Sequence, residues 1–354
     1  MISPHRSSLR LAAFGIACAL LACVLAACGS TKEDKTSSKS PGNASAFPVT
    51  ISHRFGTMTI KQLPKRVVAI GGGDMETAIS LGVDPVIGAD WFGYTKTRSW
   101  VKKALKGAPA PELVGTTQLP YEKIAAANPD LILYVNSLND AAVYHKLAEI
   151  APTIAASASV KNAYGVPWPD QLATIAKATG TTQRARTVLA DTNAIIDKAK
   201  KENPEFQGKT ITAGVFTNNS TSVWFPSDPR MQLLQQLGFK VNRQISKLDN
   251  GSFYVTLSDE QLQLMNADLI FLAARDAAGK VVKAVTDNKV FHALSTVRAG
   301  HVAYWPGPGV VNTNTEGGEF SSALSIGGPL GIAYSVPKLI PMLRGALESK
   351  KATE

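Results

Sequence analysis

Aromatic, amide and arginine side chains recur in this chain directly after short apolar segments. Those segments have the length and composition of buried strands, so the side chains that follow them belong to loops. Aromatic faces can contact an apolar ligand and arginine forks can bind anionic groups, so these loops are candidate ligand-binding segments. Core packing is the alternative for each tryptophan. The candidate ligand-binding residues are Gly73, Asp74, Trp91, Phe92, Tyr94 and Asn136 in the first half, and Asn218, Trp224, Arg230, Arg275 and Trp305 in the second.

Histidines are too scattered to suggest a metal site made by the protein. His53, His145, His292 and His301 include no close pair and no His-x-x-x-His spacing. This pattern argues against a zinc or manganese site built from protein ligands, so we expect no metal ligands in the chain.

Motifs of the common nucleotide-dependent enzymes and hydrolases are also missing. The stretch at 71–76, Gly-Gly-Gly-Asp-Met-Glu, lacks the third glycine of a dinucleotide fingerprint, and the chain contains neither a P-loop nor Gly-x-Ser-x-Gly. A Ser/His/Asp triad stays open because its members need not be close in sequence. We expect a binding protein and no enzymatic activity.

An eleven-residue stretch occurs twice and suggests how these loops are positioned. Residues 122–132 and 260–270 lie 138 positions apart and share Glu, Asn, Asp, Leu and Ile in register. Each copy predicts a short helix that runs into a buried strand, at 131–135 and 269–273. Further helices are predicted after the second copy, at 288–296 and at 337–347. A helix-strand unit that recurs at domain-sized spacing predicts two related α/β lobes.

Between the copies lies a long amphipathic stretch. Residues 183–202 carry apolar side chains at i, i+3, i+4 and i+7 over five turns, which predicts one long helix. The predicted fold is α/β, with two Rossmann-like, three-layer lobes joined by this helix and a ligand cleft between them. The expected domains are an N-terminal lobe at 47–180, the interlobe helix at 181–204 and a C-terminal lobe at 205–354. Ligands of open α/β sheets bind beyond the carboxyl ends of the strands, where the candidate residues fall.

The N-terminus has the features of an export signal. Arg6 and Arg10 precede an apolar stretch at 11–24, and Leu25-Ala26-Ala27-Cys28 resembles the lipobox of bacterial lipoproteins. We expect a signal peptide at 1–27, a lipid anchor on Cys28 and a flexible polar tether at 28–46. An ordinary secretory signal is the alternative. The predicted location is the outer face of the cytoplasmic membrane.

Charge and cysteine content fit an exported, soluble body. The net charge is +10, and it falls to +8 once the signal and its two arginines are removed. The lysines are scattered over the chain, and we expect no nucleic-acid partner for an exported protein. All three cysteines lie within residues 1–28, so the mature chain forms no internal disulfide.

In this order the elements resemble a known family, the substrate-binding lipoproteins of bacterial ABC importers for ferric siderophores, haem and cobalamin. The similarity covers about residues 48–347. Its motifs are Glu-x-Ile followed by Pro-Asp-Leu-Ile at 122–132, Leu-Ala-Glu-Ile-Ala-Pro-Thr at 147–153, and Phe-x-Ala-Leu-x-x-Val-x-x-Gly-x-Val at 291–302.

The resemblance implies a monomer that captures a ferric siderophore without turnover and delivers it to an ABC importer permease dimer. Such a chelate presents flat aromatic or apolar faces, often carries net negative charge, and supplies the ligands of its iron. It also implies that one glutamate on each lobe, Glu122 and Glu260, docks on permease arginines. Their alternative role is that of first-turn helix glutamates favoured by the helix dipole. A haem- or cobalamin-binding protein of the same architecture is the second reading. A secreted α/β hydrolase is the third.

Overall fold

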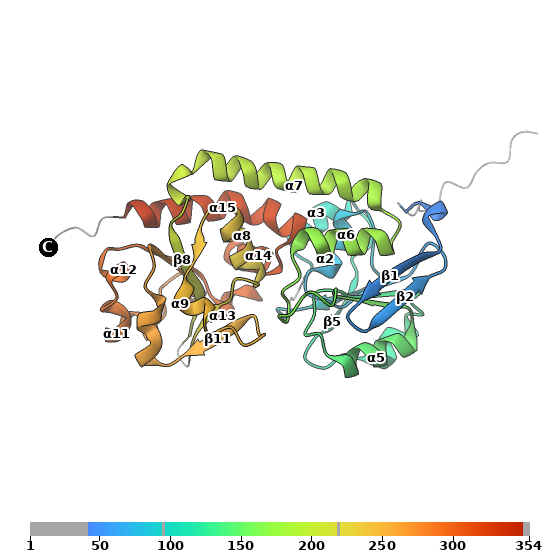
Figure 1. The fold of residues 1–354 in the computed structure, drawn as a ribbon, viewed down its shortest axis with the longest axis horizontal. Helices are drawn as coiled ribbons and strands as arrows, with labels where there is room; N and C mark the ends of the chain where they lie inside the picture. Colours follow the sequence, from blue (N-terminus) through green and yellow to red (C-terminus); the bar gives the residue numbers. More distant parts are fainter. Residues whose placement is uncertain (1–41, 94–95, 218–219, 350–354) are drawn as a thin grey trace, which may run out of the picture. The chain divides into compact units, whose positions relative to one another are not determined.

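Apolar strands flanked by amphipathic helices assemble into two lobes in the computed structural model, which describes residues 42–93, 96–217 and 220–349. The predicted signal peptide, Cys28, most of the tether, Tyr94 and Asn218 lie outside the described residues. The described residues belong to one compact unit. Both predicted lobes are present, each a sheet covered by helices, and the predicted fold class is confirmed (Figure 1).

The N-terminal lobe is built on a parallel five-stranded sheet in the order β5-β4-β3-β6-β7. Side chains alternate along β6: Leu131 and Leu133 pack on one face, and Ile132 and Tyr134 on the other. Both faces are therefore covered, as expected for a parallel sheet. The strands are β3 (Val67–Ala69), β4 (Ile87–Asp90), β5 (Glu112–Gly115), β6 (Leu131–Tyr134) and β7 (Thr153–Ala155).

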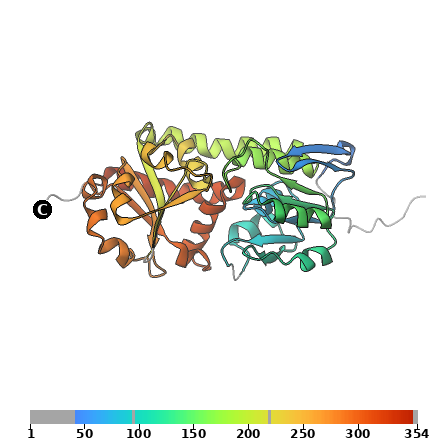
Figure 2. The ribbon, with the colours of Figure 1, turned by 60° about the horizontal axis from the view of Figure 1, so that its bottom comes forward.

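Helices α2, α3 and α6 cover one face of this sheet, and α4 and α5 cover the other. A β-hairpin of β1 and β2 packs beside α6 and β7 (Figure 2). The bounds are α2 (Asp74–Ser80), α3 (Ser99–Leu105), α4 (Tyr121–Ala126), α5 (Ala141–Ile150), α6 (Trp168–Ala178), β1 (Val49–His53) and β2 (Gly56–Ile60), with a 3₁₀ turn η1 (Ala44–Ala46) before them.

The C-terminal lobe has a mixed sheet in the order β11-β9-β8-β12-β13, with β10 paired to the start of β8. Strands β8, β12 and β13 are parallel, whereas β9 runs antiparallel to β8 and β11 antiparallel to β9. The strands are β8 (Thr210–Phe216), β9 (Thr221–Trp224), β10 (Lys240–Val241), β11 (Tyr254–Leu257), β12 (Leu269–Arg275) and β13 (Val302–Pro306).

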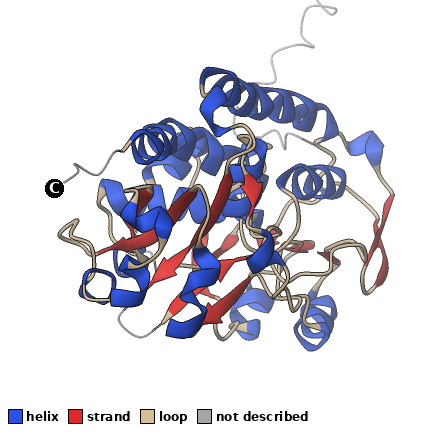
Figure 3. Ribbon diagram, turned by 60° about the vertical axis from the view of Figure 1, so that its left-hand side comes forward, coloured by secondary structure: helices blue, strands red, loops and turns tan. Residues whose placement is uncertain are grey.

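Helices again lie on both sides of this sheet, so the lobe has three layers (Figure 3). The single helix expected at 288–296 is two short helices, because the chain turns at Ala293 and Leu294 between them. The bounds are η2 (Pro204–Phe206), α8 (Pro229–Gln236), α9 (Arg243–Ser246), η3 (Asp259–Met265), α10 (Lys283–Thr286), α11 (Lys289–His292), α12 (Ser295–Arg298), α13 (Pro308–Val311) and α14 (Glu316–Ile326).

The repeated stretch occupies the same place in both sheets. Its Asp-Leu-Ile half enters β6 in one lobe and β12 in the other, and its Glu half forms α4 and the 3₁₀ helix η3. Asp130 accepts hydrogen bonds from the backbone N–H groups of Lys65 and Arg66, and Asp268 accepts one from Thr210 N–H. The recurring aspartate thus satisfies backbone donors at the start of the neighbouring strand in each lobe.

Two long helices connect the lobes. Helix α7 (Thr182–Glu202) is the predicted interlobe helix, and its buried side chains, Val188, Thr192, Ile196 and Ala199, all belong to the predicted apolar stripe. Helix α15 (Gly328–Glu348) packs against α7, against α2, α3 and α6 of the N-terminal lobe, and against α14 and β13 of the C-terminal lobe (Figure 1).

The start of α15 was predicted at Pro337, nine residues too late. Proline is common at helix starts, but Pro337 and Pro341 lie inside this helix. Both are exposed, so water can satisfy the carbonyls that lack an N–H partner. The helix begins at Gly328, directly after its N-cap Gly327, and the φ angles of 63° at Gly327 and 64° at Gly328 suit glycine.

Candidate ligand-binding cleft between the lobes

A cavity of about 600 Å³ lies between the two lobes. Its size falls in the usual range of small-molecule sites. Eight of its fourteen lining residues are apolar or aromatic. The N-terminal lobe contributes Gly72, Trp91, Phe92, Asn136, Leu138 and Tyr164, and the C-terminal lobe contributes Asp228, Pro229, Arg230, Ser252, Phe253, Tyr254, Ser325 and Ile326.

The N-terminal wall is formed where the strand order reverses, between β3 and β6. The loops that follow these strands are tied together, because Gly72 N–H donates to Asn136 O at 2.6 Å and Asn136 Nδ2 donates to Gly72 O at 3.1 Å. Asn136 Oδ1 also accepts from Val166 N–H at 3.3 Å. This is the topological switch point at which open α/β sheets bind ligands.

Asp74 supports this wall from behind and does not line the cavity. It is fully buried, and its carboxylate accepts hydrogen bonds from Val135 N–H at 2.7 Å and Gln171 Nε2 at 2.6 Å. Burial raises the pKa of Asp74 to about 6, although these hydrogen bonds oppose the rise. Gly73, which was also predicted to bind the ligand, is the N-cap residue of α2, with a φ of 76°. It does not line the cavity, whereas its neighbour Gly72 does.

Aromatic rings from both lobes form a continuous series along the cavity. The ring of Tyr164 meets Trp91 edge-on at 5.1 Å and meets Phe253 of the other lobe at 5.5 Å. Phe253 in turn lies 4.7 Å from the ring of Tyr254. Burial raises the pKa of Tyr164, so its hydroxyl stays protonated at neutral pH. The series offers ring faces and edges to an apolar ligand.

Arg230 and Asp228 supply the charge of the C-terminal wall. Asp228 caps α8 by accepting from Arg230 N–H, and its two carboxylate oxygens accept from Arg230 Nε at 2.8 Å and Nη2 at 2.6 Å. The guanidinium stacks on the Trp224 ring at 3.7 Å, and Nη1 lies 3.4 Å from Ser325 Oγ. The guanidinium is therefore fixed in one orientation at the cavity wall.

Exposed apolar side chains mark the cavity as a contact surface. Only Leu138, Tyr254 and Val290 are large hydrophobic residues that are more than a third exposed in the described part of the chain. Leu138 is 59% exposed and Tyr254 39% exposed, and both line the cavity from opposite lobes. Such surface is costly in water unless a ligand or partner covers it.

Three of the predicted residues in the C-terminal lobe do not line the cavity. Trp224 lies beneath Arg230, and Trp305 is stacked on Phe271 in the core. Arg275 donates from Nε to Tyr304 O at 3.0 Å and from Nη1 to Gly279 O at 2.6 Å. The prediction placed the ligand after β8, β12 and β13. The antiparallel β9 instead turns the chain back along β8, so the segments after β9 and before β11 form the wall.

Several lining residues were not predicted, and they share one property. Leu138, Tyr164, Ser252 and Phe253 lie outside helices and strands or at their margins, where no periodicity marks a face. Asp228 carried a signal, because an aspartate before a proline and a helix is a typical N-cap. This sequence pattern predicts that Asp228 caps the helix, but it does not predict the ion pair between Asp228 and Arg230.

Direct contacts join the lobes on either side of the cavity. Ala163 N–H donates to Gly251 O at 3.1 Å, and Asn162 Nδ2 donates to Asp249 Oδ1 at 2.8 Å. Elsewhere the buried guanidinium of Arg98 donates to the carbonyls of Val311 and Thr313 in the C-terminal lobe. We expect these contacts, together with α7 and α15, to limit the relative motion of the lobes to small displacements.

Glu122 and Glu260 are exposed and occupy matching positions. Each lies in the first turn of its helix, α4 and η3. Helix α4 packs on α5, and η3 packs on β11; α5 and β11 both lie on the side of the body opposite α7 (Figure 1). A hydrogen bond with the Ser258 side chain lowers the pKa of Glu260, so this carboxyl is ionised at neutral pH.

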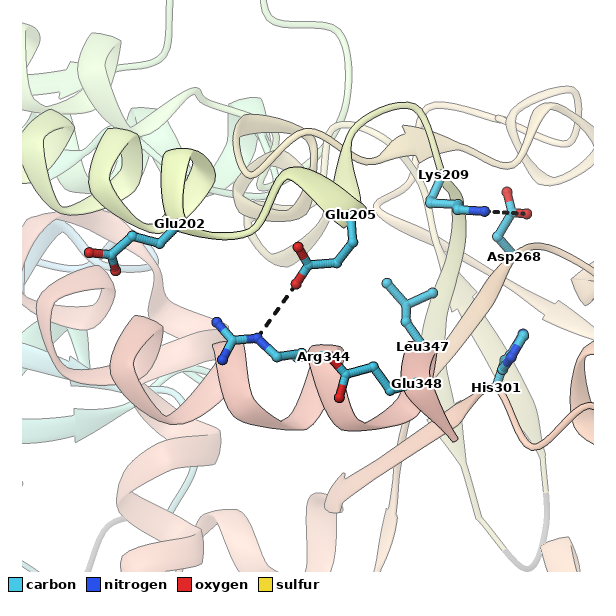
Figure 4. Close-up of a pocket in the computed structure, with 8 residues that line it drawn as sticks. All are labelled: Glu202, Glu205, Lys209, Asp268, His301, Arg344, Leu347 and Glu348. Atoms are coloured by element: carbon cyan, nitrogen blue, oxygen red, sulfur yellow. Dashed lines mark ion pairs between the residues drawn. The ribbon is translucent and has the colours of Figure 1, made fainter. Parts of the chain in front are cut away.

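A second cavity, of about 560 Å³, lies at the C-terminal ends of α7 and α15 (Figure 4). Two ion pairs lie in its wall, with Arg344 Nε 3.5 Å from Glu205 and Lys209 Nζ 3.9 Å from Asp268. It lies at the amino ends of β8, β12 and β13, the wrong edge of the sheet for a ligand site. Among the described residues, no group of three His, Cys, Asp or Glu side chains could hold a metal ion.

The predicted signal peptide and lipid anchor precede the described part of the chain. Within residues 42–93, 96–217 and 220–349, no helix combines the length and apolar character needed to cross a bilayer. The predicted anchor, Cys28, lies before these residues.

Comparison with known proteins places the chain in one family. The model of the periplasmic binding protein family matches residues 67–308. The probable siderophore-binding lipoprotein YfiY of Bacillus subtilis is 29% identical over 259 residues, which cover 70% of this chain and 74% of YfiY. The ferric enterobactin-binding periplasmic protein FepB of Escherichia coli O6:H1 is 30% identical over 253 residues, covering 66% of this chain and 72% of FepB.

Solved structures agree with the sequence relatives. Staphylococcus aureus SirA, crystallised with staphyloferrin B, superposes with a TM-score of 0.64 at 26% identity, covering 84% of this chain and 98% of SirA. The matched family region contains both sheets, α7 and nearly all of the cavity wall. This chain therefore belongs to the periplasmic binding protein family.

Proposed function

We propose that this protein is a lipid-anchored binding protein that captures a ferric siderophore between its lobes and delivers it to an ABC importer. The observation that carries the proposal is the aromatic and apolar cavity at the switch point of the N-terminal sheet. The names of YfiY and FepB, a siderophore-binding lipoprotein and a ferric enterobactin-binding protein, support the ligand class.

The chemistry of the cavity favours an intact chelate over a bare ion. The described lining includes no histidine or cysteine, and its one carboxylate, Asp228, is occupied by Arg230. Iron in this cavity would have to bring its own ligands. Trp91, Tyr164 and Phe253 then contact the organic shell of the chelate, and no covalent step is required.

The membrane anchor and the importer contact extend the proposal beyond the cavity. Lipidation of Cys28 would hold the body near the membrane through the tether at 28–46. Glu122 and Glu260 would pair with permease arginines, one on each lobe, and their exposure in matching first turns supports this role. The protein acts as a monomer in this scheme.

Tryptophan fluorescence tests the proposal, because Trp91 lines the cavity. The purified body is titrated with a panel of ferric siderophores, with free ferric ion, with haem and with cobalamin. We expect saturable quenching by at least one ferric siderophore and none by free ferric ion. Quenching by haem or cobalamin alone would favour a haem- or corrinoid-binding protein, and ester hydrolysis without chelate binding would favour a hydrolase.

A further inference from the structure

The described lining of the cleft carries no net charge. Among the described residues that line it, Asp228 and Arg230 are the charged ones, and they neutralise each other. The expectation of an anionic ligand depended on Arg230 and Arg275. Arg275 lies outside the cavity, and the charge of Arg230 is already compensated.

Most hydrogen-bond donors of the Arg230 guanidinium already have partners within the protein. Nε and Nη2 both donate to Asp228, whose side chain is 1% exposed, and one face of the guanidinium is covered by Trp224. What remains for a ligand is Nη1, beside Ser325. Arg230 can donate a hydrogen bond from this atom, but Asp228 already occupies the fork that would grip an anion.

We infer that this cleft selects an iron chelate without net charge, such as a ferric trishydroxamate, over multiply anionic tris-catecholate or polycarboxylate chelates. The inference depends on the proposed function and specifies its ligand. A trianionic chelate would lose its hydration in a largely apolar cavity and meet the buried carboxylate of Asp228, with no free cation among the lining side chains to balance it. An uncharged chelate needs only apolar contact and a few hydrogen bonds, which the ring series and Arg230 Nη1 provide.

The test compares ferrichrome, an uncharged trishydroxamate, with ferric enterobactin, a trianionic tris-catecholate, by fluorescence titration. We expect ferrichrome to bind at least about tenfold more tightly. Tighter binding of ferric enterobactin would overturn the inference and leave the proposed function standing. If neither these nor any other ferric siderophore binds, the proposed function fails, and the inference fails with it.

The variant Asp228→Asn tests whether the ion pair between Asp228 and Arg230 sets the charge preference of the cleft. Asparagine keeps the helix cap but removes the negative charge, which frees the guanidinium of Arg230. The ratio of ferrichrome affinity to ferric enterobactin affinity should fall at least about tenfold. An unchanged ratio would show that the ion pair does not set the charge preference.

Two further variants complete the design. Asp197→Asn makes the same change in net charge on an exposed position of α7, remote from the cleft, and should leave the affinity ratio unchanged. Asp228→Ser, which also provides a good cap, replaces Asp228→Asn if the latter does not fold, as judged by its thermal unfolding midpoint. A shift of the ratio in Asp197→Asn as large as that in Asp228→Asn would assign the effect to bulk charge and overturn the inference.

Discussion

Replacing Glu76 with glutamine should stabilise this protein at neutral pH and leave its stability almost unchanged in acid. Glu76 lies in α2, 3% exposed. Burial, aided by the nearby charge of Asp74, raises its pKa from 4.5 to about 7. The folded chain therefore holds this proton more tightly than the unfolded chain, and the contribution of Glu76 to stability is lost as pH rises from 4.5 through about 7.

The size of the effect follows from this difference in pKa. A rise from 4.5 to about 7 corresponds to about 3 kcal/mol of destabilisation once the group is ionised in both states. Glutamine has nearly the same shape and never ionises, so Glu76→Gln should gain up to about 3 kcal/mol at pH 8 and less than about 1 kcal/mol at pH 4.

Urea unfolding of both proteins at pH 4 and pH 8 measures this difference. The exposed Glu149→Gln on α5 is the matched control, and its free energy of unfolding should stay within about 0.5 kcal/mol of wild type at both pH values. A Glu76→Gln effect that is equal at the two pH values, or larger at pH 4, would refute the reasoning.

Three other outcomes are expected. Reversing the charges of Glu122 and Glu260 together should abolish uptake in cells and leave ligand affinity unchanged, because both lie outside the cavity; a large loss of affinity would contradict the docking role. Cys28→Ser should move the protein from the membrane to the soluble fraction, as judged by fractionation and immunoblotting, and persistent membrane retention would count against lipidation there. Arg98→Leu should lower the free energy of unfolding by about 2–4 kcal/mol in urea, because it leaves carbonyls of the other lobe without their donor; a loss below about 1 kcal/mol would show that water replaces the contact.

The sequence predicts the framework of this fold because local patterns determine it. The repeated Asp130 and Asp268 mark the same strand in each lobe, and the stripe of Val188, Thr192 and Ile196 marks the helix between them. The repeat shows where the strands begin, and the periodicity of the stripe shows which face of the helix is buried. The start of α15 was misplaced because an exposed Pro337 is tolerated inside a helix.

The cavity wall is less predictable because it depends on how distant segments meet. Asn136 was predicted, since it follows a strand of a parallel sheet. Tyr164 and Phe253 come together from two irregular segments, and no pattern within either segment indicates the contact. The direction of β9 decided which loops of the C-terminal lobe reach the cavity, and pairing direction is set by the whole sheet.

The most direct test of the proposed function is to purify the protein after growth with mixed ferric siderophores and measure its absorbance and native mass. We predict a coloured protein with the absorption band of an iron chelate and a mass increase of one chelate per chain. That mass should identify an uncharged chelate. A colourless protein with the mass of the polypeptide alone, or a haem spectrum, would contradict the central claim.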